Sequence, residues 1–541
     1  MNTMAPPPDS GLGLSQPTLP SPPTSIPWLG LIAVLMGAFI ATLTGKLSTY
    51  GLADIRGAVS AGFDEGAWIT TAQTAAQMLI TVPAVWMGAA YGPRRVLMGA
   101  SIAFALISLL TPYSPTLPVL LTMQFLGGLA SGCFIPVTLG FVTRSTPPRY
   151  WAFGIAIYAM NLELSLNISA SLEGWYVEHH SWRWIFWQNV PLALIMSLCL
   201  WRGIKDKPPL ERPPADAFGL LAGSTGLALI YASLDQGNRL DWLGSGLVWG
   251  LMLAGALLFS ASYIHEARTA SPVLNLKVIF GAPIASQLLL IGFLRLTIIA
   301  TAYLITLYLG VVRGYRDLEV GETLIWIAAP QFLVCPFAAV ILRRLDARLV
   351  ASIGFIFVSV ACLLVAYNLT PLWGSYQFLP SSLLQALGQS FALSGVIFLG
   401  VLHMKPQYAL TLGALLQTAR LMGGEIGSAF VATMARVREQ VASNLIGQHV
   451  QVGNPGVIER VREYGAMTTK VVDPVSALAR GELVLGDVVR AAATTQAVID
   501  VFAVIAVLTA LALLIVVFRR RAPEGPASAP PLFPVRNANP P

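Results

Sequence analysis

The chain has 541 residues, of which 55% are hydrophobic and only 11% are charged. A soluble protein has about 25% charged residues because its surface must be hydrated, so this composition excludes a chain of soluble domains and predicts a membrane protein. The formal net charge is +7. The Lys and Arg residues lie in short clusters between apolar runs and not on one basic face, which argues against a nucleic-acid partner.

Long apolar runs follow one another along almost the whole chain. A bilayer core about 30 Å thick needs about 20 apolar residues per helix. The runs are continuous and do not alternate, which favours helices over barrel strands, so an all-α membrane protein with fourteen transmembrane helices is predicted. The predicted spans are 28–50, 67–88, 96–112, 117–142, 152–173, 185–203, 217–233, 243–263, 284–312, 322–342, 349–367, 378–402, 409–435 and 495–518.

The charges of the short loops predict the orientation. With a cytoplasmic N-terminus, the inner loops hold fourteen Lys and Arg residues between Arg94 and Lys405, and the short outer loops hold five. Positive charge collects on the cytoplasmic side, so we expect a multi-pass protein of the cell (inner) membrane with both termini inside. The long segment 436–494 then lies outside, where it is either a docking surface or a connector. The Pro-rich ends, 1–27 and 519–541, are predicted to be disordered cytoplasmic tails.

Two cytoplasmic loops carry matching sequence motifs. GAAYGPRR (88–95) follows the second span, and RRLDAR (343–348) follows the tenth. Glycine and proline predict a tight turn, and the arginines can bind free carbonyl groups at the C-terminal end of a neighbouring helix. Motifs at corresponding places indicate an internal repeat, which is common in transporters. The candidate residues of these loops are Gly92, Arg94, Arg95, Asp346 and Arg348.

These motifs resemble those of the major facilitator superfamily. Gly92, Arg94 and Arg95 match the end of its cytoplasmic loop signature, although Ala89 replaces an acid. In span 4, QFLGGLASG (124–132) has the glycine spacing of a second family motif, with Gln124 in place of its arginine.

A third motif is more specific. SWRWIFWQNVP (181–191) is similar to the hallmark of the fourteen-span drug:proton antiporters of the EmrB/QacA type. The antiporter signature expected in span 5 is reduced to Gly174 within SASLEG (169–174). The sequence REQVASNL, which begins at Arg438, also resembles that group.

The resemblance implies a major facilitator fold, with two six-helix halves around a central cavity and two helices inserted between them. The implied division is a tail (1–27), an N-terminal half (28–203), a linker with two inserted helices (204–283), a C-terminal half (284–518) that includes the outer loop 436–494, and a tail (519–541). Substrate would then move by alternating access, driven by protons.

Of the charged residues inside predicted spans, five are candidate functional groups. They are Lys46, Glu163, Arg295, Arg420 and Glu425. A charge at bilayer depth costs about 2.5 to 3.5 kcal/mol, so these groups are expected to face a wet cavity or one another. Each half offers a cation on its first helix and an acid on its fifth, which predicts the pairs Lys46 with Glu163 and Arg295 with Glu425. Both a structural and a transport role remain open for these pairs, and Glu163 and Glu425 are the candidates for proton coupling.

The other candidates for the cavity are uncharged. Gln124 and Asn161 are expected to line it together with Lys46, Arg295 and Arg420, whereas Ser165 and Ser169 are expected to bond neighbouring helices. Because three cations oppose two acids in this set, the cavity is expected to favour anionic or zwitterionic amphipaths over permanent cations. The small-residue pairs Gly128–Gly132 and Gly423–Gly427 predict close helix packing.

The sequence offers no sign of an enzyme, a metal site or a cofactor. It contains no Walker or Gly-x-Ser-x-Gly motif, and its four cysteines lie singly in apolar runs. A proton-coupled secondary exporter of small amphipathic compounds is therefore predicted, with a periplasmic membrane-fusion adaptor and an outer-membrane channel as further partners. The alternatives are a transport-inactive sensor on the same fold and an exporter of one specific metabolite or weak acid.

Overall fold

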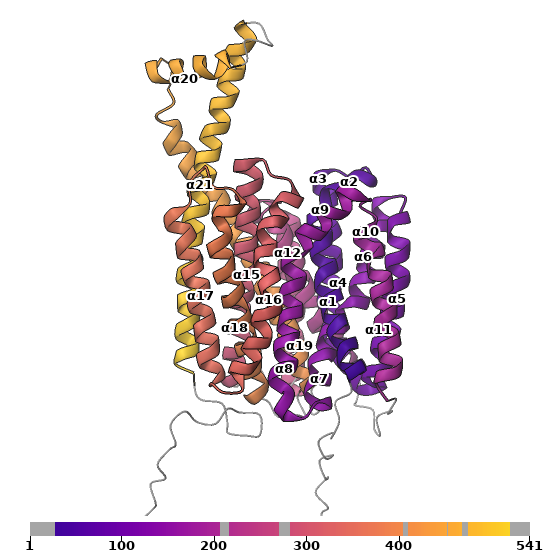
Figure 1. Ribbon diagram of the computed structural model, residues 1–541. Coiled ribbons are helices and arrows are strands. Elements are labelled where there is room, and N and C mark those ends of the chain that lie inside the picture. The colour runs from indigo at the N-terminus through magenta and orange to yellow at the C-terminus, as the bar shows by residue number, and fades with distance from the viewer. Residues whose placement is uncertain are drawn as a thin grey trace, which may run out of the picture.

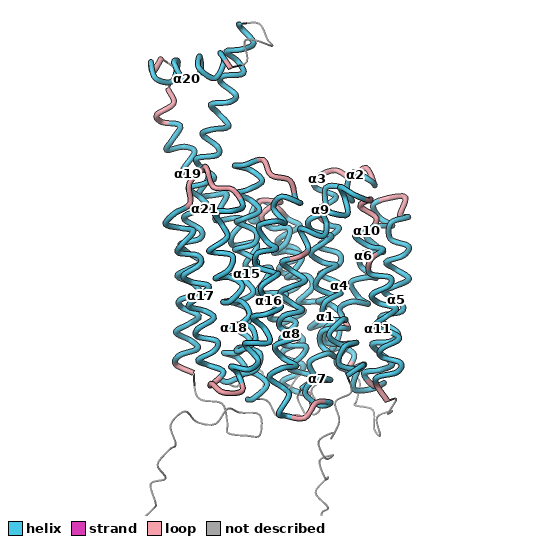
Figure 2. The backbone as a smooth tube through the Cα atoms, viewed as in Figure 1, coloured by secondary structure: helices cyan, strands magenta, loops and turns pink. Residues whose placement is uncertain are grey.

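The computed structural model describes residues 28–205, 216–269, 282–403, 409–451, 453–467 and 474–519. Both predicted tails lie outside these ranges, except Arg519, as do residues 206–215 and 270–281 of the predicted linker. Every regular element in the described chain is helical (Figure 2), which confirms the all-α prediction. The helices are α1 (Trp28–Tyr50), α2 (Leu52–Ala58), α3 (Phe63–Gly66), α4 (Trp68–Tyr91), α5 (Pro93–Leu110), α6 (Leu117–Gly132), α7 (Phe134–Ser145), α8 (Trp151–Asn167), α9 (Ser169–His179), α10 (Trp184–Trp187), α11 (Asn189–Gly203), α12 (Ala217–Gly237), α13 (Gly246–Arg268), α15 (Ala282–Arg313), α16 (Asp317–Leu342), α17 (Ala347–Asn368), α18 (Leu379–His403), α19 (Ala409–Gly447), α20 (Pro455–Ala466) and α21 (Pro474–Val517).

In the described ranges, eleven helices are long and apolar enough to cross a membrane, or twelve if α8 and α9 form one span with a 44° bend. The two other predicted spans, 67–88 and 409–435, form α4 and α19, which are long enough but more polar. α4 carries Thr and Gln side chains near its start, and α19 carries Arg420 and Glu425. The count of fourteen therefore stays a prediction, and both helices outside the apolar set contribute side chains to a central cavity.

The helices form two bundles that stand side by side (Figure 1). The helices α1 to α11 make one bundle, and α15 to α19 with α21 make the other. Across the interface, α8 and α9 pack against α16, and α7 packs against α19. The main apolar core runs through both bundles, whereas many Leu, Phe and Ile side chains on the outside are exposed, as expected for a surface in lipid.

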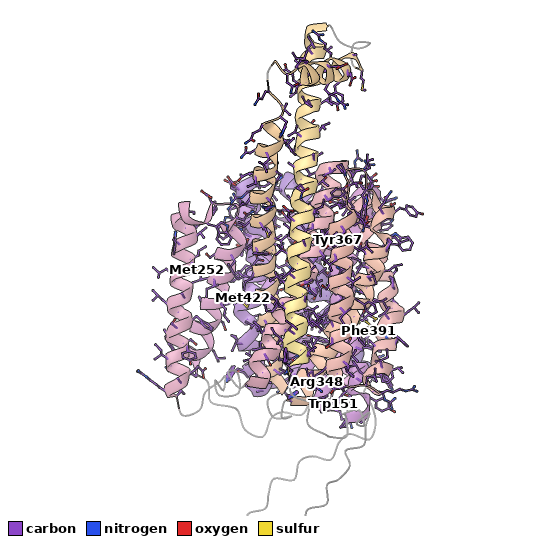
Figure 3. The ribbon with its side chains drawn as sticks, turned by 90° about the vertical axis from the view of Figure 1, so that its left-hand side faces the viewer. Trp151, Met252, Arg348, Tyr367, Phe391 and Met422 are labelled. Carbon is purple, nitrogen blue, oxygen red and sulfur yellow. The ribbon has the colours of Figure 1, made fainter. Side chains whose placement is uncertain are left out.

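The inserted helices α12 and α13 pack against each other at the edge of this assembly. α12 also packs against α4 and α19, so it contacts both bundles. α13, which carries Met252, lies outside α12 at the edge of the molecule (Figure 3).

Small residues allow the closest helix contacts, as the sequence predicts. A Cβ atom at Gly128 would lie 2.2 Å from the carbonyl oxygen of Gln73, and one at Gly423 would lie 2.4 Å from the Cα atom of Gly292. Gly132 and Gly427 are equally confined. These distances are too short for any side chain, so the prediction of close packing is confirmed at all four glycines.

One end of the molecule carries an extension built from the end of α19, α20 and the start of α21 (Figures 1 and 3). We call this end the extension end. The first and last described helical residues, Trp28 and Val517, lie at the opposite end of the bundles (Figure 1), which we call the terminal end. The described residues of the predicted outer segment 436–494 are thus largely helical, with α20 packed against α21.

Candidate functional site: a charged central cavity

A cavity of about 470 Å³ lies between the two bundles. Its walls come from the last third of α1, the first turns of α4, the end of α12, and the middle of α15 and α19, with Leu166 of α8 and Asp317 of α16. The cavity therefore lies in the half of the molecule nearer the extension end. The charged residues that line it are Lys46, Asp235, Arg295, Asp317, Arg420 and Glu425.

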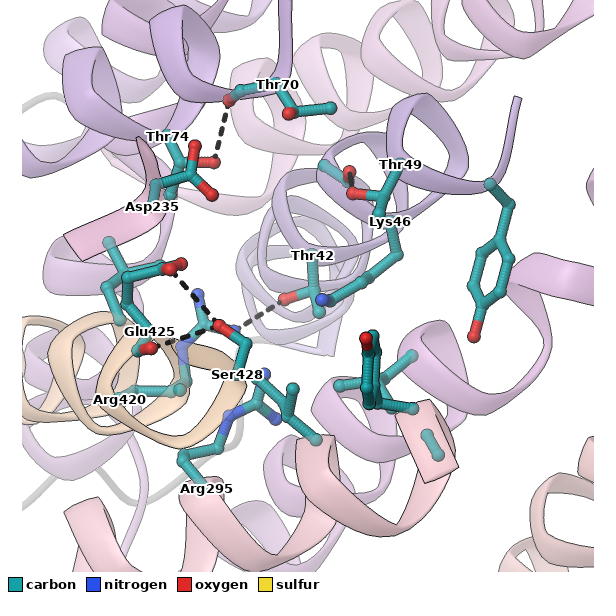
Figure 4. Close-up of a pocket in the computed structure, with 18 of the residues that line it drawn as sticks. Thr42, Lys46, Thr49, Thr70, Thr74, Asp235, Arg295, Arg420, Glu425 and Ser428 are labelled. Carbon is teal, nitrogen blue, oxygen red and sulfur yellow. Dashed lines mark hydrogen bonds between the residues drawn. The ribbon is translucent and has the colours of Figure 1, made fainter. Parts of the chain in front are cut away.

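Four of the five predicted intramembrane charges meet here (Figure 4). Lys46 reaches in from α1, Arg295 from α15, and Arg420 and Glu425 from α19. These residues are up to 379 positions apart in the chain, so only the packing of the two halves brings them together. Their shared exposure to one cavity agrees with the expectation that charged groups avoid lipid.

Glu163, the fifth, lies behind the cavity wall. Its side chain is buried and accepts a hydrogen bond of 3.2 Å from Nε2 of Gln331, while its Oε1 has no hydrogen-bond partner in the described part of the chain. Gln331 also donates to Gln389, to which Asn167 donates as well. A buried amide network therefore holds Glu163 at the interface between α8, α16 and α18.

The predicted pairing of these charges is wrong. Glu163 interacts electrostatically with Arg295, and Glu425 interacts with Lys46, so each acid faces the cation of the opposite half. The expectation failed because the repeat shows which helices of the two halves correspond, but not which of their side chains face each other across the cavity between the halves. Within the described residues, none of these acids forms an ion pair shorter than 4.0 Å with Lys46 or Arg295.

The two arginines differ in their hydrogen bonding. Arg420 donates from Nε to Gln417 and from Nη1 to Thr42, at 3.0 and 3.1 Å. Arg295 is only 3% exposed, yet its Nε and Nη1 atoms have no partner among the described residues. A buried donor without a hydrogen-bond partner destabilises the folded state, so these two atoms are candidates for contact with a substrate.

Two predicted cavity residues lie elsewhere. Gln124 is buried in α6 and Asn161 lines a smaller, mostly apolar pocket between α1, α8 and α11. The Nδ2 atom of Asn161 lies 3.4 Å from the carbonyl oxygen of Leu35. The prediction that both residues line the central cavity is therefore wrong, because neither side chain lies on the part of its bundle that faces this cavity.

The cavity contains acids that the sequence analysis missed. Asp235 lies near the end of α12, which continues to Gly237, four residues beyond the predicted span. Asp317 begins α16, five residues before the predicted span. With Glu425 they give three lining acids against three lining cations, so the expected positive excess of the cavity is wrong. The sequence could have indicated both acids, because Asp235 and Asp317 lie within a few residues of the ends of predicted spans.

The two loop motifs that the sequence predicts to be cytoplasmic lie at the terminal end, away from the cavity. Gly92 has a φ of 90°, which favours glycine, and Pro93 then begins α5. Arg94 donates to the carbonyl oxygen of Trp201, in the last turn of α11. This is the type of contact expected for the arginine pair.

The second motif makes the equivalent contact in the other half. Asp346 caps α17 by accepting a hydrogen bond from the backbone N–H of Arg348 and is bound by the Arg348 guanidinium at 2.9 Å. Arg348 also donates to the carbonyl oxygen of Arg519, just beyond α21. Both motifs thus join the start of one helix to the end of another.

No group of three or more metal-ligating side chains occurs in the described ranges. The described cysteines are likewise free of disulfides. The cavity offers instead a mixture of carboxylates, cations, threonines and tyrosines, together with apolar side chains such as Ile299 and Leu421. Such a lining suits a reversible guest with both charged and apolar parts.

Comparison with known proteins agrees with this architecture. The family model described as Major Facilitator Superfamily matches residues 29–428. The multidrug export protein EmrB of Haemophilus influenzae is 22% identical over 452 residues, which cover 81% of this chain and 87% of that protein. The probable multidrug resistance protein EmrY of Escherichia coli is 24% identical over 450 residues, covering 79% and 84%.

Two further proteins extend the comparison. The fatty acid resistance protein FarB of Neisseria gonorrhoeae is 23% identical over 445 residues, covering 79% of this chain and 84% of that one. The crystal structure of the human organic anion transporter MFSD10 matches the fold with a TM-score of 0.54 at 15% identity, covering 91% of this chain and 98% of that one. Because the family model spans most of the sequence, the chain belongs to the major facilitator superfamily, a family of transporters and not of enzymes, and within it resembles the EmrB-type multidrug exporters.

Proposed function

We propose that this protein is a proton-coupled secondary exporter that moves small amphipathic compounds by alternating access. The observation that carries the proposal is the central cavity, whose opposing charges and apolar wall lie at the interface between two bundles. A volume of about 470 Å³ falls in the range of about 300 to 1,000 Å³ that holds drug-sized ligands. The similarity to proteins named for multidrug export supports the same direction of transport.

Glu163 and Glu425 are the proposed proton carriers. Each is buried, and each has a cation of the opposite half as its electrostatic neighbour. Protonation would remove the attraction across the interface and so change the preference between two arrangements of the halves. A two-state element biased by a local charge is the usual physical basis of such a switch.

The substrate would be held by groups of both signs. Arg295 offers two donors without partners, Glu425 and Asp235 offer carboxylates, and Ile299 and Leu421 offer apolar contact. With balanced formal charge, the lining favours guests that combine an apolar body with polar or charged groups. The balanced lining gives no reason to expect anionic or zwitterionic substrates over permanent cations.

The proposed setting is the inner membrane, with the terminal end in the cytoplasm and the extension end outside. The distribution of Lys and Arg in the loops supports this orientation. The extension would then project away from the lipid on the outer side, where a periplasmic adaptor and an outer-membrane channel are proposed to continue the export path.

Transport by the purified protein tests the proposal. In proteoliposomes with an acid interior, a fluorescent amphipath outside should accumulate inside in exchange for protons, and an uncoupler should stop the accumulation. Empty liposomes with the same gradient give the background. Accumulation that is unaffected by the uncoupler would contradict proton coupling, and its absence for a panel of amphipaths in folded protein would favour the sensor alternative.

A further inference from the structure

Asp235 brings an inserted helix into the central cavity. It lies three residues before the described C-terminal cap of α12 at Asn238 and lines the cavity together with Tyr231, one turn earlier on the same helix. α12 reaches this position because it packs against α4 of one half and α19 of the other. The partner inserted helix α13 lies outside α12 and contributes no described residue to the cavity.

Only one oxygen of the Asp235 carboxylate, Oδ2, accepts hydrogen bonds from the described residues. The hydroxyl of Thr71, on α4, donates to its Oδ2 atom, and the Gln236 amide donates to the same oxygen at 3.4 Å. Gln236 also donates to Thr71 at 2.6 Å and accepts from Arg239, which pairs with Asp64 at 2.7 Å. No hydrogen bond to the Oδ1 atom occurs among the described residues, so this oxygen is available at the cavity surface.

Asp235 and Glu425 are electrostatic neighbours across the contact between α12 and α19. Glu425 accepts a hydrogen bond of 3.1 Å from Ser428. Figure 4 shows both carboxylates on one side of the cavity, with the Lys46 side chain extending towards them from α1. Lys46 interacts electrostatically with both acids but makes no hydrogen bond or ion pair shorter than 4.0 Å in the described structure.

The charges around this pair can be counted element by element. α1 supplies Lys46, α12 supplies Asp235 with Tyr231 and, further out, Arg239, and α19 supplies Glu425 with Arg420 on its other side. α4 presents only uncharged side chains to the cavity, among the described residues Thr70, Thr74 and Gln77. α15 supplies Arg295, whose acidic neighbour is Glu163, and Arg239 is bound to Asp64. The local group of Asp235, Glu425 and Lys46 therefore carries one more negative than positive charge, although the cavity lining as a whole is balanced.

We propose that Asp235 and Glu425 form an acidic pair that holds one exchangeable positive charge, either a proton or the cationic group of a substrate, with Lys46 as its fixed counter-charge. This inference rests on the proposed export function and deepens it, because it makes the inserted helix α12 part of the transport site. Two like charges close together in a poorly hydrated cavity repel each other, so a bound cation is favoured there. A proton and a cationic group of the substrate then compete for the Asp235–Glu425 pair, so binding of one releases the other.

The test is equilibrium binding of tetraphenylphosphonium, a single-charge apolar cation, to the purified full-length protein in detergent. Calorimetry gives the affinity, and a pH indicator in weak buffer gives the protons released. In the unaltered protein, binding should release up to one proton per cation. Asp235→Asn and Glu425→Gln should each weaken binding by about tenfold or more and abolish the release, because the remaining carboxylate is balanced by Lys46.

A matched control and an opposite change sharpen this test. Glu322 is exposed on α16 and does not line the cavity, so Glu322→Gln should bind the cation and release protons as the unaltered protein does. Lys46→Gln removes the counter-charge and should tighten binding of the cation. The Asp235→Asn variant keeps a side-chain oxygen that can accept the hydrogen bond from Thr71. Thermal unfolding of each variant verifies that it is folded.

The two sources of positive charge are separated by an acid–base titration without the cation. If only a proton occupies the pair, tetraphenylphosphonium does not bind, but the unaltered protein still takes up one proton more than Asp235→Asn between about pH 5 and 9, the range in which perturbed carboxylates titrate. Binding and titration in Asp235→Asn identical to those of the unaltered protein would overturn the inference. Neither readout requires transport, so failure of export with intact proton exchange would instead count against the proposed function.

Discussion

Gln331 on α16 donates a hydrogen bond of 3.2 Å to the carboxylate of Glu163 on α8, and this contact crosses the interface between the two halves. The same amide donates to Gln389 on α18 at 3.3 Å. Arg295, which lines the cavity, is the electrostatic neighbour of Glu163 on the other side. A change of charge at Glu163 would therefore alter both its hydrogen bond to Gln331 across the interface and its electrostatic interaction with Arg295 in the cavity wall.

We expect Glu163→Gln to reduce proton-driven export at least tenfold while the protein remains in the membrane. Glutamine keeps an oxygen that accepts from Gln331, so the fold is preserved, but it cannot gain or lose a proton. Dye export in everted vesicles across about pH 6 to 8, around neutrality, measures the effect. Glu482→Gln, an exposed position on α21, is the control. Undiminished export by Glu163→Gln over this range would remove Glu163 from the coupling mechanism.

The sequence identified the charged residues of the site but not their partners. A charge within an apolar run is visible in the sequence because its cost in lipid is high, which is why Lys46, Glu163, Arg295 and Glu425 were found. Their pairing depends on how the two halves face each other, and nothing local to α1 or α15 encodes it. Asp235 was missed because a span predicted from hydropathy stops where polar residues begin. The helix α12 itself continues to Gly237, and its polar end lines the cavity.

Spacing of small residues was a reliable guide to packing, because a missing side chain has a direct geometric consequence. Gly174, the glycine retained from the antiporter signature, lies on α9 against α16. A Cβ atom there would lie 2.7 Å from both the backbone N and Cα atoms of Leu318. The neighbouring Ser171 donates to the carbonyl oxygen of Gly321 at 2.8 Å, so this is a tight contact between the halves.

Gly174→Ala should therefore push the halves apart on this side. We expect a loss of about 1 to 3 kcal/mol in stability, as for other overpacked contacts, and a lower thermal unfolding temperature. Gly57→Ala, on α2, is the control because nothing lies within 4 Å of a Cβ atom there. Equal unfolding temperatures for the two variants would show that α9 and α16 separate without cost.

Acid should weaken one contact at the terminal end. Asp216 precedes α12 and accepts hydrogen bonds from the backbone N–H of Gly219 and, at 2.8 Å, from His265. The Gly219 hydrogen bond, with a further contribution from His265, lowers the pKa of Asp216 from 3.8. A lowered pKa in the folded state gives stability that is present above pH 3.8 and is lost as the pH falls through the folded value below it.

The difference in unfolding temperature between the unaltered protein and Asp216→Ala should therefore be largest above pH 3.8 and should shrink at lower pH. Thermal unfolding in detergent across this range measures it. Glu178→Gln, an exposed position on α9, gives the background drift with pH. A difference that grows as the pH is lowered would mean that the cap at Gly219 does not stabilise α12.

The extension gives the last prediction. Val437, Val441 and Leu445 recur every four residues on α19, so they share one face, and each is more than 40% exposed. The base of the extension is held by Arg438, whose Nε atom donates to Asp500 of α21 at 2.6 Å. An apolar stripe on a fixed helix beyond the bundle suits docking against a helix of an adaptor.

We expect that replacing Val437, Val441 and Leu445 with serine will stop export to the medium in a cell with two membranes, and that transport in proteoliposomes will persist. Exchange of Gln440 and Asn444, exposed on the same helix, for alanine is the matched control. Crosslinking in cells that express the adaptor should capture it with the unaltered protein and the control variant but not with the serine variant. If the serine variant exports to the medium as well as the unaltered protein does, the stripe is not a docking surface, and the extension serves only to join α19 to α21.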